Sequence, residues 1–220
     1  TLMSLPYLME FPYECAEQTF SRYFGNILAQ KIIQDNPAFG RVIATWKETN
    51  PQAFLSELEK NIELKSIILS ETPWVRDAQR ESAQRHRLAA LFEGNNLESN
   101  CIGALEKLKQ MQSADGGWGW FGGESNLYIT QHIVSGFGQL KQLGVDFDET
   151  MAKEALAFLE TKYAEQFIQI KKVDQEKLVG LSDLHVHWLV ARSYFNSKPT
   201  EVSTYYGKCL AKDWKNYNLH

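Results

Sequence analysis

The residues most able to do chemistry are a cysteine and a glutamine three positions apart, Cys15 and Gln18. They stand at the start of a predicted amphipathic helix, where side chains three residues apart lie on the same face. Attack of the Cys15 sulfur on the side-chain carbonyl carbon of Gln18 would expel ammonia. It would close a ring of about fifteen atoms, little more than one helical turn of roughly 3.6 residues. The product would be an internal thioester, a latent acyl donor toward an amine or a hydroxyl.

The surroundings of this pair would help the reaction. A helix N-terminus favours thiolate over thiol, and its exposed amides would steady a developing oxyanion. Nearby aromatic side chains would exclude water and so prevent hydrolysis; they are Phe11, Tyr13, Phe20 and Tyr23. For the four-residue pattern alone, the alternative is an ordinary helix start with one free cysteine.

The elements that must position these residues are predicted to be helices. Apolar residues recur at spacings of three and four in stripes that begin at Phe20, Phe54, Ile129, Met151 and Leu181. Asn-Pro pairs and glycines separate the stripes, and strand-like alternation is nearly absent. The pattern predicts an all-α fold of about eight or nine helices, paired as antiparallel hairpins.

One segment interrupts the helices. The stretch from Gln110 to Gly123 ends a helix and then turns, because Asp115-Gly116-Gly117 makes positive φ angles accessible. We expect Trp118, Trp120 and Phe121 to fill space between neighbouring helices, so that this loop stabilises the hairpins. The functional alternative is an aromatic substrate pocket.

Two of these segments resemble motifs of a known family. The run Pro12–Thr19 is similar to the thioester signature of the alpha-2-macroglobulin family, particularly of its bacterial members. The Asp115–Trp118 loop resembles one that recurs in alpha-alpha toroids, including thioester domains, and the Tyr128–Ile133 helix follows it as in the family. The resemblance implies that residues 1–220 form a single thioester-type domain, an alpha-alpha toroid cut from a larger multidomain protein. Because the family's toroid is longer, C-terminal helices would be missing.

The resemblance also implies roles for individual residues. Cys15 and Gln18 match the thioester pair, and Glu17 matches an acid that orients or polarises the site. His132 is a candidate for acyl transfer by its rough spacing, since some complement members redirect the thioester to hydroxyls through an acyl-imidazole. The alternative is a partly buried helix histidine bonded to backbone. Many animal members have glycines where this chain has Glu14 and Ala16.

The function implied by the resemblance is that of a protease inhibitor in host defence. Cleavage of a bait segment elsewhere in the parent protein would expose the thioester, which would capture the attacking protease covalently, typically through a lysine. Each molecule would react once, so the protein would not be an enzyme. The other domains of the parent chain would be its remaining partners. Bacterial relatives place it in the periplasm or at the cell envelope.

Composition excludes several other classes. Lys+Arg 23 against Asp+Glu 27 gives a net charge of −4, and the scattered basic residues predict no nucleic-acid partner. No apolar run has the roughly 18 to 20 residues of a membrane span, so we expect no membrane insertion by this segment. The three cysteines lie far apart and form no CxxC pair, so we expect no metal and no cofactor. Cys101 and Cys209 fall on apolar helical stripes and are predicted to be small buried hydrophobes.

Three other functions fit the residues less well. His185 and His187 would point to nearly opposite sides of a helix and could not chelate one ion. A Cys-His protease dyad at Cys15 would leave Gln18 unexplained. A prenyltransferase or terpene cyclase would need an Asp-rich or zinc-binding set, and Asp146-Phe147-Asp148 is more easily a helix cap. A toroid that forms no thioester and serves as an interaction module remains the main alternative.

Overall fold

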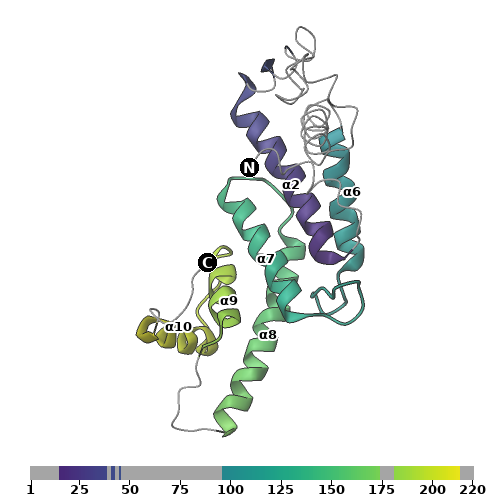
Figure 1. Cartoon of the computed structure of the whole chain (residues 1–220). Coiled ribbons are helices and arrows are strands. Elements are labelled where there is room, and N and C mark those ends of the chain that lie inside the picture. Colours follow the sequence, from purple (N-terminus) through teal and green to yellow (C-terminus); the bar gives the residue numbers. More distant parts are fainter. Residues whose placement is uncertain (1–14, 39–40, 43–44, 46–95, 174–180, 214–220) are drawn as a thin grey trace, which may run out of the picture. The chain divides into compact units, whose positions relative to one another are not determined.

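The computed structural model describes residues 15–38, 41–42, 45, 96–173 and 181–213. This part of the chain contains six helices of 11 residues or more and no strand, which confirms the all-α class there (Figure 1). The predicted helix that begins near Phe54 lies outside the described residues. The closure of hairpins into a toroid stays a prediction.

The helices are α2 (Ala16–Asp35), α6 (Asn96–Met111), α7 (Leu127–Gln142), α8 (Thr150–Val173), α9 (Asp183–Ser193) and α10 (Glu201–Asp213). The described connections are short between α7 and α8 and between α9 and α10, whereas a longer loop, residues 112–126, joins α6 to α7. The chain divides into two compact units, one within residues 1–12 and 21–105, the other within residues 13–20 and 106–220. Helices α2 and α6 therefore contribute residues to both units. Whether residues 1–220 act as a single domain stays a prediction.

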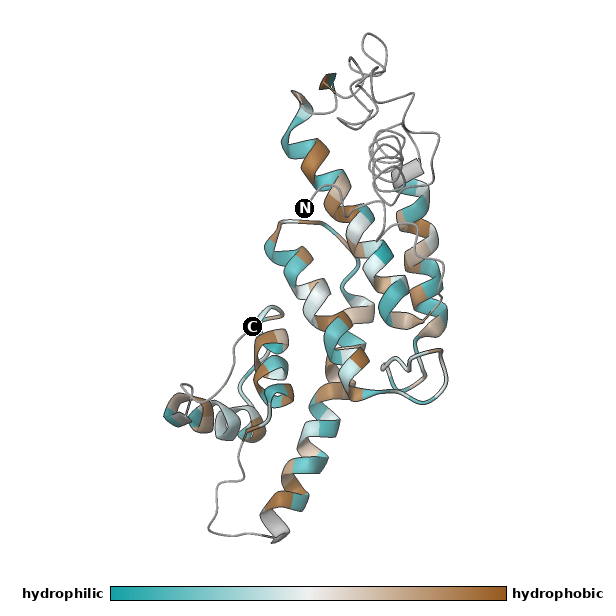
Figure 2. Cartoon of the chain, in the orientation of Figure 1, coloured by the Kyte–Doolittle hydropathy of each residue, from teal (hydrophilic) through white to brown (hydrophobic). Residues whose placement is uncertain are grey.

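The unit formed by residues 13–20 and 106–220 is built around helix α7. Helices α8 and α9 both pack against α7, and α10 packs against α9 and α8. Figure 2 shows hydrophobic and hydrophilic residues alternating along α8, as expected for a helix with one buried face. The apolar stripes predicted from Ile129 and from Met151 are confirmed, because all their members are buried: Ile129, Ile133, Phe137, Leu140, Met151, Ala155, Phe158 and Leu159.

Side-chain caps define where these helices begin. The Asn126 side chain accepts a hydrogen bond from Ile129 N at 3.1 Å and so caps α7. Asp148 Oδ1 accepts from both the backbone N–H and the hydroxyl of Thr150, at 3.0 and 2.6 Å. The helix cap predicted for Asp146–Asp148 is confirmed, and these bonds lower the pKa of the Asp148 carboxyl.

The other unit holds the later part of α2 and the first part of α6. Tyr23 and Cys101 are both buried there. Burial, and to a smaller extent Cys101, raises the pKa of Tyr23 to about 12; burial, and then Glu98, raises the pKa of Cys101 to about 11. A thiol with so high a pKa is unreactive at neutral pH. Cys101 and Cys209 are thus the buried hydrophobes that their stripes predicted. None of the described helices is long and apolar enough to cross a bilayer.

Candidate functional site

Cys15 is the residue from which helix α2 starts. Its backbone carbonyl accepts the first intrahelical hydrogen bond, from Thr19 N at 2.9 Å, and its Sγ lies 3.5 Å from the backbone nitrogen of Gln18. The sulfur therefore occupies the place where a serine or threonine hydroxyl usually caps a helix. Cys15 is only 3% exposed. The thiol is thus buried in the first helical turn, beside the backbone of its predicted reaction partner.

Gln18 carries a side-chain oxygen that is buried. Among the described residues, Gln18 Oε1 has no hydrogen-bond partner. A buried and unpaired amide oxygen destabilises a fold by about 1–3 kcal/mol, so native proteins retain few of them without a reason. The side chain that would supply the acyl group therefore lacks the hydrogen bond that a buried glutamine oxygen normally accepts.

The Asp115–Trp118 loop reaches the same helix start. The backbone N–H of Ala16, next to Cys15, donates to the carbonyl of Trp120 at 2.8 Å. The loop itself is fixed by Trp118, whose indole N–H donates to Leu108 O at 2.9 Å and whose backbone N–H donates to Thr130 Oγ1 at 2.8 Å. The structure therefore brings together the two motifs that the sequence analysis singled out.

One prediction about this loop is wrong. Trp118 is fully buried as expected, but Trp120 and Phe121 are 47% and 82% exposed. The chain doubles back after Trp118, and a Cβ atom at Gly119 would lie against the carbonyl oxygens of Glu124 and Gly122. This tight return directs the Trp120 backbone toward α2, while its ring stacks on Tyr128 at 6.5 Å on the exposed side instead of filling space between helices.

Glu17 and His132 meet at this site. His132 Nε2 lies 4.0 Å from Glu17 Oε1, and both side chains are partly exposed, at 40% and 34%. The Phe20 and His132 rings are nearly perpendicular with centroids 6.3 Å apart, and Phe20 also packs on Phe137 at 5.0 Å. The structure thus places four predicted site residues within the same unit: Cys15, Glu17, Gln18 and His132. The neighbour of the His132 imidazole is a carboxylate, whereas the alternative interpretation expected a hydrogen bond to the backbone.

A glycine that the sequence analysis missed makes room for Phe20. A Cβ atom at Gly136 would overlap the Phe20 ring. Thr19, fully buried, adds a contact from its Oγ1 to Met111 Sδ at 3.8 Å. No signal in the sequence pointed to Gly136, because a glycine inside a helix reads as a weak helix former until the neighbour across it is known.

Two of the predicted aromatic shields cannot be placed at this site. Phe11 and Tyr13 lie outside the described residues. Tyr23 is buried, but it belongs to the unit of residues 21–105. Among the described members of the predicted four, Phe20 lies within the unit of the site, and its ring contacts His132.

The two histidines of α9 have separate surroundings. His185 Nδ1 accepts a hydrogen bond from Ser182 N at 3.1 Å, and burial lowers the pKa of the imidazole. Burial also lowers the pKa of His187, and the charge of His132 lowers it further. Within the described ranges, no group of three His, Cys, Asp or Glu side chains is arranged to hold a metal ion.

Comparison with known proteins gives one partial similarity. No family model and no solved structure matches this chain. A curated relative, Alpha-2-macroglobulin of Thermotoga maritima, is 25% identical over 157 residues, which is 71% of this chain and 6% of the relative. The chain therefore spans a small part of the length of the relative it matches. This similarity suggests the alpha-2-macroglobulin family, in agreement with the motifs around Cys15 and Asp115.

Proposed function

We propose that this chain is the thioester-bearing helical domain of a macroglobulin-like protein that captures proteases covalently. The observation that carries the proposal is the first turn of α2, where the buried Cys15 sulfur lies 3.5 Å from Gln18 N and the buried Gln18 Oε1 has no partner among the described residues. The partial similarity to an alpha-2-macroglobulin supports an inhibitor instead of a catalyst.

The bond would form and break by ordinary acyl transfer. The Cys15 thiolate attacks the side-chain carbonyl carbon of Gln18, a C–S bond replaces the C–N bond, and ammonia leaves with the thiol proton. Later an amine on the protease attacks the same carbon. The C–S bond then breaks, the sulfur takes up a proton, and a stable amide joins the two proteins. The protein is consumed in this reaction, so it is not a turnover catalyst.

Glu17 and His132 would assist the second step. At a separation of 4.0 Å, the Glu17 carboxylate would orient the imidazole toward the site. A neutral His132 would take the proton of an incoming hydroxyl, or accept the acyl group itself and pass it on. Partial exposure of both side chains leaves this side of the site open to a nucleophile.

The proposal also has consequences for the rest of the parent protein and for its location. The matched relative is far longer than this chain, so bait segment, protease specificity and further domains would lie in other parts of the parent protein. We propose the periplasm or the cell envelope as its location, where a protein would meet foreign proteases.

Intact mass spectrometry of the longest folded form of the parent chain tests the proposal. A closed thioester lowers the mass by one ammonia relative to the encoded sequence. Methylamine should add at Gln18 and release one titratable thiol at Cys15, and Cys15→Ala should abolish both effects. Cys101→Ala is the matched control, because that thiol is also buried but is followed three residues later by Ala104 instead of a glutamine. A free Cys15 thiol with full mass and no methylamine uptake would exclude covalent capture and favour a toroid that serves as an interaction module.

The role of His132 is tested by the choice of nucleophile. Wild-type protein should transfer the acyl group to both glycerol and methylamine. His132→Ala should keep the reaction with methylamine and lose roughly ten- to a hundred-fold in the reaction with glycerol, as expected for removal of a general base or nucleophile. Equal losses with both nucleophiles would show that His132 only supports the fold.

A further inference from the structure

A pocket of about 370 Å³ lies between helix α8 and the loop that joins α9 to α10. None of its residues belongs to the candidate thioester site. Its walls combine three cationic side chains, one carboxylate, two hydroxyls and three apolar side chains: Lys153, Arg192, Lys198, Glu160, Ser197, Thr200, Leu156, Ala157 and Phe195. The formal charge of this lining is 3 − 1 = +2, in a chain whose net charge is −4.

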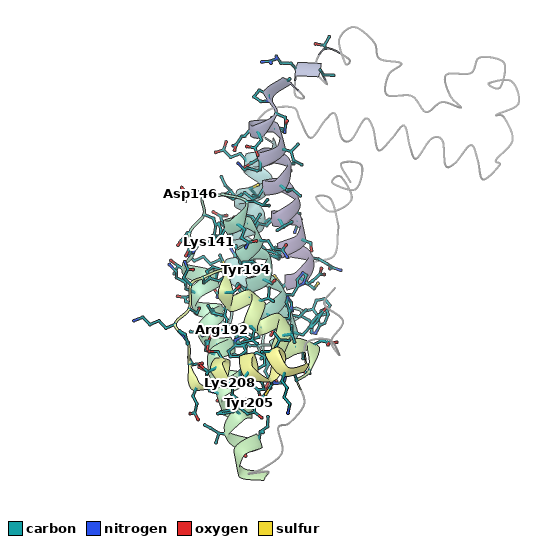
Figure 3. All side chains as sticks on the ribbon, turned by 90° about the vertical axis from the view of Figure 1, so that its left-hand side faces the viewer. Lys141, Asp146, Arg192, Tyr194, Tyr205 and Lys208 are labelled. Carbon is teal, nitrogen blue, oxygen red and sulfur yellow. The ribbon has the colours of Figure 1, made fainter. Side chains whose placement is uncertain are left out.

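Arg192, labelled in Figure 3, extends from helix α9 and is the buried cation of this pocket. The residue is only 8% exposed, and its guanidinium carbon lies 5.3 Å from the ring centre of the fully buried Trp188. Its Nε donates to Glu160 Oε1 at 2.7 Å, and its Nη2 donates to the carbonyl of Lys198 at 2.8 Å. These two bonds prevent the side chain from turning, so the guanidinium presents a constant face.

The two bonds leave part of the guanidinium unused. Arginine has five N–H donors, and the bonds to Glu160 and Lys198 occupy two of them. Nη1 has no hydrogen-bond partner among the described residues, and Nη2 has a second N–H, so the outer edge of the guanidinium keeps donors that are not used. Such an edge binds a carboxylate through two parallel hydrogen bonds.

Of the other polar groups in the pocket, Glu160 accepts from Arg192 and Thr200 is bonded to Ser203, which leaves the donors of Lys198, Ser197 and Lys153. Within the described part of the chain, Lys198 Nζ and Ser197 Oγ have no hydrogen-bond or ion-pair partner. Lys153 is paired with Glu149 at 3.1 Å and is mostly exposed, so it adds positive charge more than a fixed bond. Hydrogen-bond donors around one edge of Arg192 favour a ligand with a negatively charged acceptor group. The adjoining side chains of Leu156 and Phe195 favour an apolar part of the same ligand next to that group.

We infer that this pocket binds a carboxylate carried on a short apolar stem, as found at the C-terminus of a peptide or in an acidic side chain. The carboxylate would lie against the outer edge of Arg192, with Lys198 and Ser197 at its side. The stem would lie on Leu156, Ala157 and Phe195. The inference is independent of the proposed function, because it concerns different residues and no covalent step.

Titrations followed by ¹H–¹⁵N NMR test the inference with three small probes. They are N-acetyl-leucine, whose carboxylate is terminal, N-acetyl-leucinamide, which is neutral, and N-acetyl-glutamic acid α-amide, whose carboxylate is on a side chain. We expect at least one acid to bind with a dissociation constant in the millimolar range and to shift the signals of Ser197 and Lys198. The neutral amide should bind about tenfold more weakly or not at all, as expected for the loss of about 1.4 kcal/mol. Comparison of the two acids distinguishes a terminal from a side-chain carboxylate.

Charge-reversal variants localise the binding. Lys198→Glu should lower the affinity for the acid at least about fivefold. Lys208→Glu changes an exposed residue of α10 that does not line the pocket, so it should leave the affinity unchanged. Both positions are exposed, so both variants should fold. Equal binding of acid and amide, equal effects of the two variants, tighter binding of inorganic phosphate than of either acid, or absence of any shift would each overturn the inference.

Discussion

At the scale of single residues, Cys15 stands in a position that a hydroxyl side chain usually fills. Its sulfur lies 3.5 Å from the N–H of Gln18, in the geometry of a helix cap. A cysteine is a poorer cap than serine, since sulfur is a weak acceptor. A structural role alone would therefore favour serine here, whereas thioester chemistry requires sulfur.

Cys15→Ser separates these two roles. Because serine caps helices well, thermal stability should stay within about 1 kcal/mol of wild type. Uptake of methylamine should vanish, since an oxygen at this position forms no thioester. Denaturant unfolding checks the stability, and mass spectrometry checks the uptake of methylamine. A stable protein that still incorporates methylamine would contradict the assignment of Cys15.

Gly136 is a second position where a single added atom would change the packing, here that of the Phe20 ring. A Cβ atom there would overlap the Phe20 ring, which packs against His132 and Phe137. We expect Gly136→Ala to destabilise the fold by about 1–3 kcal/mol, as overpacking does, and to broaden or shift the His132 signals in NMR.

The matched control for Gly136→Ala is Gly207→Ala. Gly207 lies inside helix α10, and nothing stands within 4 Å of the Cβ atom it would gain. Alanine there should stabilise the fold by about 0.5–1 kcal/mol through the ordinary helix preference. If both substitutions were stabilising, the close approach of Phe20 to Gly136 would be wrong.

At the scale of elements, helix α9 begins with a titratable cap. Ser182 N donates to His185 Nδ1, so the neutral imidazole carries its proton on Nε2, and burial lowers its pKa below the usual 6.5. The unfolded chain then binds more protons than the folded one in this range. Stability contributed by neutral His185 is therefore present above about pH 6.5 and is lost as the pH falls toward the lowered pKa.

The denaturation midpoint should accordingly fall between pH 7 and pH 5, in the range where an ordinary histidine titrates. His185→Gln keeps an acceptor for the Ser182 N–H and should show a smaller fall. The pKa of His187 is also lowered, so His187 should cause the fall in midpoint that persists in His185→Gln. Identical pH profiles for wild type and His185→Gln would contradict this account.

Helices α8 and α9 are joined by a partly buried ion pair. Glu160→Ala removes the partner of Arg192, whose side chain is 9% exposed, and should destabilise the protein by about 1.5–3 kcal/mol. Glu165→Ala on the same helix removes an exposed partner of Lys162 and should change stability by less than about 0.5 kcal/mol. Urea unfolding of the pair of variants measures the difference, and equal effects would show that the Arg192 contact contributes little.

At the scale of the whole molecule, stability should be unevenly distributed. Helix α7 has the largest buried face and packs extensively against both α8 and α9, whereas α10 packs less extensively against α9 and α8. Hydrogen exchange should therefore be slowest in α7, with protection at least about tenfold higher than in α10, because deep helices open only near global unfolding. Equal protection in the two helices would show that their unit opens as a single block.

Local patterns were sufficient for several features. The stripe from Ile129 to Leu140, the cap at Asp148 and the burial of Cys101 and Cys209 follow from helical periodicity and capping chemistry, which act over a few residues. The proximity of Cys15 to Gln18 was predictable for the same reason, since one helical turn separates them.

Contacts between distant segments were decided only by the tertiary structure. Packing brought His132 to Glu17, Trp120 O to Ala16 N, and the Arg192 edge to the pocket beside α8, and it left Trp120 and Phe121 exposed against expectation. Periodicity tells which face of a helix is buried but not which side chain lies across from it. That choice depends on how whole helices fit together, so the sequence by itself determined the first turn of α2 that holds Cys15 and Gln18, and the tertiary structure determined what surrounds it.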